Sequence, residues 1–314
     1  MLIPMPQYPL YTATLSVLGA TSIPYYLNES ENWRVDMSAI KEAHETAKAA
    51  GTDVRAIVVI NPGNPTGTVL SEQDISAIIE YAREQRLVII ADEVYQTNIF
   101  VNKFHSFKKV LCQMQAKALD RFAHVELASL HSVSKGMIGE CGHRGGYFEL
   151  VGFDPRVQAE IYKFVSITLC APVIGQCLVS LMVNPPQEGD PSYALYRGEY
   201  TKILTDMRSR AQTLHSIFAQ MDGVQCGEPE GSMYLFPSIR LPPKAVQAAA
   251  AEGRTPDEFY SLKLLDATGV CVVPGSGFGQ KEGSSHFRTT FLVPGMEWTN
   301  RVVEFHRRFM QEYQ

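Results

Sequence analysis

The sequence predicts an α/β fold, with a mostly parallel sheet in a large first domain and a smaller α+β domain after it. Three observations predict it. The first half alternates short, continuous apolar runs with amphipathic stretches, which is typical of parallel strands covered by helices on both faces. A link rich in proline and glycine follows at residues 185–191. Beyond the link, a long amphipathic stretch leads into a mixture of helical and strand patterns.

The strands of the first domain are the clearest elements. Leu2, Ile3 and Met5 predict a strand at the very start. Later apolar runs predict further parallel strands at Ala56–Ile60, Leu87–Ala91, Val125–Leu130 and Gly146–Val151. Ser71–Glu84 is predicted to be a helix between two of them, with Ser71 as its N-cap and Asp74 in its first turn.

The second half is predicted to begin with one long helix over Ser192–Met221. Strand patterns then occupy residues 231–237, 270–273 and 286–292, with a helix over Pro256–Thr268. Residues 275–279 ("GSGFG") predict a tight turn and not a nucleotide loop, because the strand–loop–helix context is missing. We expect residues 1–185 to form the large domain, and residues 186–314 the interdomain helix and the small domain.

Composition limits the classes of function. The chain has 314 residues, a net charge of −5 and cations spread along its length, so neither nucleic acid nor a membrane surface is an expected partner. Its six cysteines form no CxxC pair, which predicts reduced and mostly buried thiols. The histidines do not stand at ligand spacings from these cysteines, so we expect no metal site.

Polar residues of matching chemical types follow three of the predicted strands. Asn64 lies in the segment after the strand at 56–60, Asp92 and Tyr95 after the strand at 87–91, and Lys135 after the strand at 125–130. The carboxyl ends of neighbouring parallel strands meet at one edge of a sheet, where ligands bind. The three sets are therefore predicted to converge.

The converging side chains match the needs of pyridoxal phosphate. That cofactor requires a lysine amine, an anion at the ring nitrogen, donors to the ring oxygen, hydroxyls and a guanidinium for the phosphate, and an aromatic face. The residues that fill these needs are, in the same order, Lys135; Asp92; Tyr95 with Asn64; Ser132 and Ser134 with Arg144; and Tyr8. Tyr11 is an alternative for the aromatic face, and Asn61 is interpreted as a turn former only.

The motifs that carry these residues resemble those of the class I, fold-type I, pyridoxal-phosphate-dependent aminotransferases. The motifs are "NPGNPTG", "ADEVY", "SVSKGMIGECGHRGG" and "VPGSGFG" followed by "HFRTTFL". The forms "PQYPLY", "FHSFKKV" and "GECGHRGGY" are most similar to the alanine aminotransferase branch and to its relative, glutamate:glyoxylate aminotransferase.

The resemblance assigns each candidate residue a role. It implies that Lys135 is the Schiff-base lysine and that Asp92 pairs with the pyridine nitrogen. The remaining roles that it implies are Tyr95 and Asn64 at the ring oxygen, Ser132, Ser134 and Arg144 at the phosphate, Tyr8 stacked on the ring, and Asn64 with Arg288 at the substrate carboxylate. Arginine suits that last role because its planar fork holds a carboxylate bidentately.

The resemblance also implies an activity and an assembly. The expected reaction moves the amino group of L-alanine to 2-oxoglutarate and gives pyruvate and L-glutamate, within a homodimer. A glyoxylate-using enzyme and an inactive fragment or non-catalytic relative are the alternatives. We expect a cytoplasmic protein, with mitochondria and peroxisomes left open.

Members of this family carry a further segment before the equivalent of "PQYPLY", including a phosphate-binding loop at a helix N-terminus. We therefore expect the sequence to be truncated at its N-terminus, and the activity of the chain as given to depend on that segment.

Overall fold

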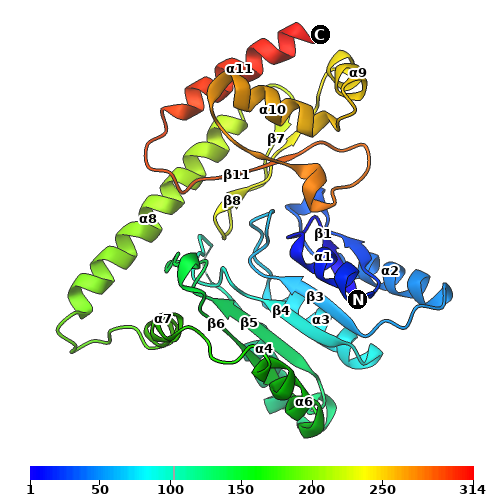
Figure 1. The fold of residues 1–314 in the computed structure, drawn as a ribbon, viewed down its shortest axis with the longest axis vertical. Helices are drawn as coiled ribbons and strands as arrows, with labels where there is room; N and C mark the ends of the chain where they lie inside the picture. Colours follow the sequence, from blue (N-terminus) through cyan, green and yellow to red (C-terminus); the bar gives the residue numbers. More distant parts are fainter. Residues whose placement is uncertain (102) are drawn as a thin grey trace.

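A central sheet organises the first half of the chain. The computed structural model describes residues 1–101 and 103–314. Within them the sheet has six strands in the order β2-β1-β3-β4-β5-β6 (Figure 1). The strands are β1 (Leu2–Met5), β2 (Ile23–Tyr26), β3 (Ala56–Ile60), β4 (Val88–Asp92), β5 (Leu127–Ser132) and β6 (Gly146–Val151). The mostly parallel sheet predicted from the apolar runs is confirmed.

Helices between the strands supply the core. They are α1 (Leu10–Val17), α2 (Met37–Ala49), α3 (Glu72–Gln85), α4 (Phe107–Lys117) and α5 (Leu119–Phe122), with the short 3₁₀ helix η1 (Glu29–Glu31). One face of the sheet packs against α2, α3 and α4 in a cluster that includes Ile40, Ile78 and Val110. The other face packs around Leu15 of α1, which contacts Ile3 and Val58. Burial of these apolar faces stabilises the sheet.

The helix α3 begins where the sequence predicts. Ser71 accepts a hydrogen bond from the Asp74 N–H, and the Asp74 carboxylate accepts one from the Ser71 N–H, at 3.1 and 3.0 Å. This capping box satisfies two of the free N–H groups at the helix start.

The prediction for the sixth strand was wrong in direction. β6 pairs with β5 antiparallel, with Ser132 opposite Gly146. A parallel pair needs a crossover connection, usually a helix. In the described residues 133–145 there is only the 3₁₀ helix η2 (Cys141–His143), so the chain turns back directly beside β5. Apolar content alone does not distinguish the two directions.

The three parallel strand ends that carry the polar motifs lie in register. Ile60 is opposite Asp92, and Asp92 is opposite Leu130. Two backbone hydrogen bonds continue the ladder past the strands, from the Asn61 N–H to the Asp92 carbonyl at 2.9 Å and from the Glu93 N–H to the Leu130 carbonyl at 3.1 Å. The predicted convergence of the three strand ends at one edge is confirmed.

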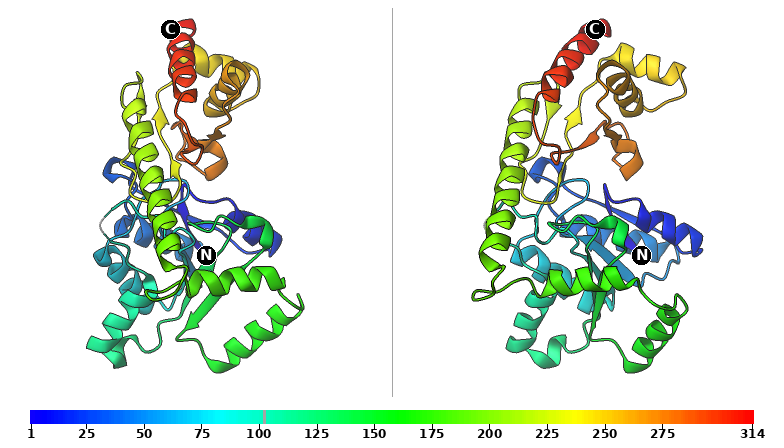
Figure 2. Two further views of the ribbon diagram at one scale, coloured as in Figure 1. Left: turned by 90° about the vertical axis from the view of Figure 1, so that its left-hand side faces the viewer. Right: turned by 60° about the vertical axis from the view of Figure 1, so that its left-hand side comes forward.

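One long helix leads away from the sheet. The chain runs through α6 (Pro155–Ser166) and α7 (Val173–Val183) into α8 (Tyr193–Phe218), the long helix that rises along one side of the molecule in Figures 1 and 2. This confirms the helix predicted over 192–221. Its buried residues Met207, Ala211, Leu214 and Phe218 recur every three or four positions, which places them on one face.

The C-terminal part packs on that buried face. Its elements are β7 (Val224–Gln225), β8 (Tyr234–Leu235), β9 (Ser238–Ile239), α9 (Pro243–Ala251), α10 (Pro256–Thr268), β10 (Val273–Pro274), the 3₁₀ helix η3 (Gly275–Phe278), β11 (Phe287–Thr290) and α11 (Trp298–Glu312). The antiparallel order β10-β11-β8 joins three of the predicted strand segments. Tyr95 and Phe100, which follow β4, belong to the same apolar cluster. The domain boundary between 185 and 186 stays a prediction.

The cysteines differ from the expectation. Cys112, Cys141, Cys170, Cys177 and Cys271 are exposed and Cys226 is half-buried, so the prediction of mostly buried thiols was wrong. Spacing along the sequence does not tell on which side of a helix or loop a cysteine falls. Among the described residues no helix combines the length and the apolar character needed to span a bilayer.

Ser71→Ala should lower the free energy of unfolding by about 1 kcal/mol, because it removes the helix cap. Denaturant unfolding measures this loss. Ser76→Ala is the matched control on the same helix, since Ser76 bonds only the Glu72 carbonyl within the helix. It should change the stability by less than about 0.5 kcal/mol. Equal losses in the two variants would contradict the role of the capping box.

Candidate active site

Asp92 supplies the buried carboxyl group of the site. It ends β4, and its side chain is almost enclosed, with the residue only 8% exposed. The Tyr11 hydroxyl donates to one carboxylate oxygen at 2.7 Å, and the Val94 N–H lies 3.4 Å from the other. Burial raises the pKa of Asp92, while the Tyr11 hydrogen bond, the Val94 N–H and the charge of Lys135 act in the opposite direction. Lys135 is therefore close enough to Asp92 for the two charges to interact.

Two tyrosines near the start of α1, Tyr8 just before it and Tyr11 within it, lie in different surroundings. Tyr11 is committed to Asp92, and burial together with that carboxylate raises its pKa well above the usual value. Tyr8 is 42% exposed, and its proximity contributes to the raised pKa of Tyr11. Tyr8 thus keeps an exposed ring near Tyr11, and its stacking role stays a prediction.

Lys135 lies in the loop between β5 and β6, together with the predicted anion-binding groups. The Ser132 hydroxyl donates to the Gly145 carbonyl at 3.1 Å and accepts from the Ser134 N–H at 3.0 Å. The exposed Arg144 guanidinium lies 3.5 Å from the Ser134 hydroxyl and donates to the Cys141 carbonyl at 2.8 Å. The loop gathers two hydroxyls and a cation at one place, a donor set that suits a phosphate.

A cavity of about 160 Å³ separates Lys135 from the long helix. Its lining includes Lys135 and His131 from the β5 end, and Tyr196 and Tyr200 from α8. Burial lowers the pKa of His131. Lowering the pKa favours the neutral imidazole at pH 7.

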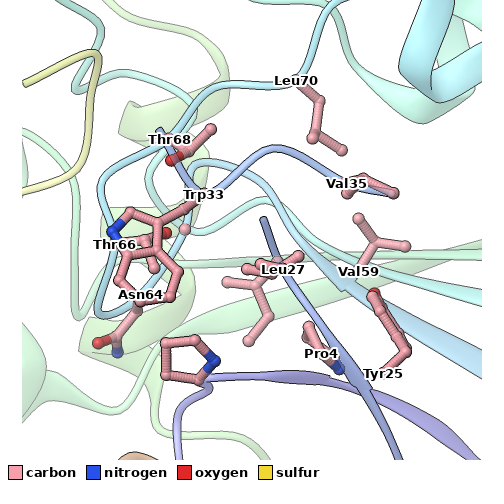
Figure 3. Close-up of a pocket in the computed structure, with 13 residues that line it drawn as sticks. Pro4, Tyr25, Leu27, Trp33, Val35, Val59, Asn64, Thr66, Thr68 and Leu70 are labelled. Carbon is pink, nitrogen blue, oxygen red and sulfur yellow. The ribbon is translucent and has the colours of Figure 1, made fainter. Parts of the chain in front are cut away.

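The segment from Asn61 to Leu70 holds Asn64 in a fixed position. The buried Asn61 accepts a hydrogen bond from the Leu70 N–H at 3.0 Å, which closes the segment and supports its interpretation as a turn former. A Cβ at Gly63 would lie 2.2 Å from the Thr66 hydroxyl, so a side chain at this position would force Thr66 to move. Asn64 and Thr66 line a cavity of about 20 Å³, which has room for about one water molecule and not for a substrate. Figure 3 shows these two side chains among the others that line it.

Arg288 reaches Asn64 from the C-terminal part of the chain. Its guanidinium donates to the Asn64 side-chain oxygen at 3.0 Å. It also lies over the rings of Tyr234 and Phe278, 4.3 and 4.8 Å from their centroids. The Arg288 Nε is buried and has no hydrogen-bond partner among the described residues. A buried donor left unpaired is costly, and a carboxylate would satisfy it.

Tyr95 completes the site between the two halves of the chain. It is 1% exposed, and its hydroxyl lies 3.0 Å from the Tyr234 hydroxyl. Burial and Tyr234 raise its pKa most, Asp92 adds to the rise, and the positive charge of Arg288 opposes it. The structure thus places Asp92 and Arg288 close enough to Tyr95 for both charges to act on the pKa of its hydroxyl.

Comparison with known proteins decides the family. The model of the family "Aminotransferase class I and II" matches residues 1–301. The chain belongs to the class I and II aminotransferases. This aminotransferase is 50% identical to the mitochondrial alanine aminotransferase of Saccharomyces cerevisiae over 99% of its own length and 53% of that protein. It is 48% identical to a protein of the same yeast named inactive alanine aminotransferase, over 100% of its length and 62% of that protein.

Solved structures agree with this result. An alanine aminotransferase from Pyrococcus furiosus superimposes with a TM-score of 0.79 at 25% identity, covering 99% of this aminotransferase and 70% of that chain. The chain spans about half to two thirds of the length of the curated relatives that it matches. The fold-type I class expected from the sequence is confirmed.

Two side chains of the site were missed by the sequence analysis. Tyr234 and Phe278 form the walls around Arg288, yet they lie in segments predicted only as a strand and a tight turn. Tyr234 faces the site because β8 pairs with β11, with Tyr234 opposite Thr290. Such a register is set by tertiary pairing, and no local pattern around residue 234 indicated it.

Tyr11→Phe should raise the pKa of Asp92 in the cofactor-free aminotransferase, because it removes a donor to the charged carboxylate. Titration of ¹³C-labelled aspartate carboxyls by NMR would show this, with Asp92→Asn assigning the signal. Tyr8→Phe is the matched control and should leave the titration in place. If the Asp92 titration were the same in Tyr11→Phe as in the wild type, the hydrogen bond would not matter.

The sign of the linked stability effect follows from the same shift. Burial places the pKa of Asp92 above its unfolded value, so the folded state holds the proton more tightly. The contribution of Asp92 to the free energy of unfolding therefore falls as pH rises through its titration, and it should fall over a wider pH range in Tyr11→Phe.

Proposed function

We propose that the protein is a pyridoxal-phosphate-dependent aminotransferase that moves the amino group of L-alanine to 2-oxoglutarate. The observation that carries this proposal is the convergence of Lys135, the buried Asp92 and the Arg288–Asn64 pair at one edge of the sheet. L-Alanine is proposed as the amino donor because the compared relatives are named alanine aminotransferases.

The residues fit the cofactor. Asp92 is a buried carboxylate beside Lys135, Tyr8 offers an exposed ring, and Ser132, Ser134 and Arg144 gather donors for a phosphate. Pyridoxal phosphate, when bound, supplies an electron-accepting ring whose protonated nitrogen needs a neighbouring anion. Asp92 would hold that proton in place, because an anion with little access to water interacts strongly with a nearby cation.

Arg288 and Asn64 would bind the substrate. The unpaired Nε of Arg288 gives the guanidinium an unused donor towards a carboxylate, while Asn64 occupies one of its other nitrogens. A carboxylate held in this way fixes the orientation of the α-carbon. Lys135 would then take the α-proton onto its amine as a general base and give it back later in the reaction as a general acid. Positioned acid–base catalysis of this kind contributes about 10²–10⁴-fold to the rate.

Assembly and location are part of the same proposal. A homodimer is proposed from the resemblance, and the exposed apolar side chains of the 164–173 region support it. Phe164, Ile167, Leu169 and Val173 are 72–85% exposed, and contiguous apolar exposure of this kind marks interaction surfaces. The cytoplasm remains the proposed compartment, with mitochondria and peroxisomes left open; the yeast relative is named mitochondrial.

Lys135→Ala should abolish both the visible absorption band of the lysine-bound cofactor and alanine turnover, with turnover falling at least about 10²-fold. Absorption spectra and a pyruvate assay measure the two effects. Lys109→Ala, an exposed change on α4, is the control and should keep both.

The wild-type result separates the enzyme from an inactive relative. Borohydride reduction followed by mass spectrometry should find a pyridoxyl group on Lys135. Its absence from the wild type, or a band and turnover retained in Lys135→Ala, would contradict the proposal.

Arg288→Lys should raise the KM for alanine roughly 10- to 100-fold, because lysine cannot reproduce the bidentate fork, whose charged hydrogen bonds are worth about 1.5–3 kcal/mol. The absorption band of the cofactor should remain. Steady-state kinetics at saturating 2-oxoglutarate gives the KM. An unchanged KM would place the substrate carboxylate elsewhere.

A further inference from the structure

We propose that Tyr234 is a positioning residue that serves both halves of the site, holding the Tyr95 hydroxyl with its own hydroxyl and the Arg288 guanidinium with its ring. The inference rests on the proposed function, since it assigns a task to a residue beside the cofactor and substrate positions. It would make one side chain of β8 responsible for the alignment of two groups from distant segments of the chain.

The hydroxyl of Tyr234 carries the first task. It lies 3.0 Å from the Tyr95 hydroxyl, and the two rings meet edge to face, with 5.7 Å between their centroids. Tyr234 and Tyr95 are 5% and 1% exposed. Water therefore has little access to either hydroxyl, and the two hydroxyls form a hydrogen bond with each other.

The direction of this hydrogen bond follows from proton counting. A phenol has one proton to donate. If Tyr95 donates its proton to the cofactor ring oxygen, as the resemblance to the family implies, its oxygen must accept from Tyr234. A hydroxyl that accepts a hydrogen bond becomes a stronger donor itself. Tyr234 would thus strengthen the hydrogen bond from Tyr95 to the ring oxygen without touching the cofactor.

The ring of Tyr234 carries the second task. The Arg288 Cζ lies 4.3 Å from its centroid and 4.8 Å from that of Phe278. Both rings are buried, at 5% and 3% exposure. An arginine near two aromatic rings in a desolvated setting is stabilised by cation–π attraction and loses side-chain freedom. The remaining nitrogens of Arg288 are then held ready for a carboxylate.

The charged groups around Tyr95 are the same in the wild type and in the variants. Asp92 and Arg288 both act on the Tyr95 hydroxyl, the first raising its pKa and the second lowering it. Lys135 faces Asp92. These charges stay in place in the variants below, so a change in the titration of the cofactor reports on Tyr234.

Three variants separate the two tasks. Tyr234→Phe removes the hydroxyl and keeps the ring. Phe278→Leu removes the second ring that contacts Arg288 and leaves Tyr95 untouched. Tyr234→Leu removes both contributions. The experiment uses each protein loaded with pyridoxal phosphate. It measures the pH midpoint of the absorption band and the Kd for 2-methylalanine, an amino acid without an α-proton that binds without turnover.

Tyr234→Phe should move the pH midpoint upward by roughly 0.3 to 1 unit, since a weaker donor leaves more negative charge on the ring oxygen to hold the titrating proton. Its Kd should stay within about two-fold of the wild type, because the ring under Arg288 remains. Phe278→Leu should show the reverse pattern, with an unchanged midpoint and a Kd raised roughly 2- to 30-fold. Tyr234→Leu should show both changes.

An unshifted midpoint in Tyr234→Phe, in a background where the wild type shows the band, overturns the first task alone. A Kd that rises as much in Tyr234→Phe as in Tyr234→Leu overturns the second. If Tyr234→Leu does not fold, Tyr234→Met, which also removes both the hydroxyl and the ring, replaces it in both comparisons. A wild type that lacks the band overturns the proposed function itself and is recognised before any variant is compared.

Discussion

The in-register ends of β3, β4 and β5 are the constraint on which the rest of the site depends. Backbone hydrogen bonds from Asn61 to Asp92 and from Glu93 to Leu130 continue the ladder beyond the strands. They fix the starting points of the Asn64 segment and the Lys135 loop on either side of Asp92. A shift of one residue would turn each side chain to the opposite face of the sheet. Accurate placement therefore comes from a rigid sheet, while the reactive groups lie in the segments that follow it.

The site also depends on the groups that surround the buried carboxyl of Asp92. Asp92 is buried, which alone would favour its protonated form, and the Tyr11 hydroxyl, the Val94 N–H and Lys135 favour its anion. These partners come from α1, the segment after β4 and the loop after β5. Groups from several elements thus offset part of the cost of burying the charge, although burial still raises the pKa of Asp92, and this makes the local pKa a property of the whole fold.

Contacts across the chain close the site. Arg288 on β11 donates to Asn64, and Tyr234 on β8 meets Tyr95. The Gln7 N–H, just before Tyr8, donates to the Phe278 carbonyl of η3 at 2.9 Å. Each of these contacts joins the sheet end to the C-terminal part. The position of Arg288, for which a substrate role is proposed, is therefore tied to the sheet end through a small set of polar and aromatic contacts.

The sequence by itself determined the family and most of the elements. Strand ends followed by Asn64, Asp92 and Lys135 predicted the converging edge, and Ser71 with Asp74 predicted the start of α3, because these signals are local. Tertiary structure decided the direction of β6, the commitment of Tyr11 to Asp92, and the placement of Tyr234 and Phe278 around Arg288. Those features depend on which strands pair, in which register, and on which side chains meet across long stretches of chain. Local patterns carry no information about such pairings, because the free energy that selects them comes from contacts formed only in the folded state.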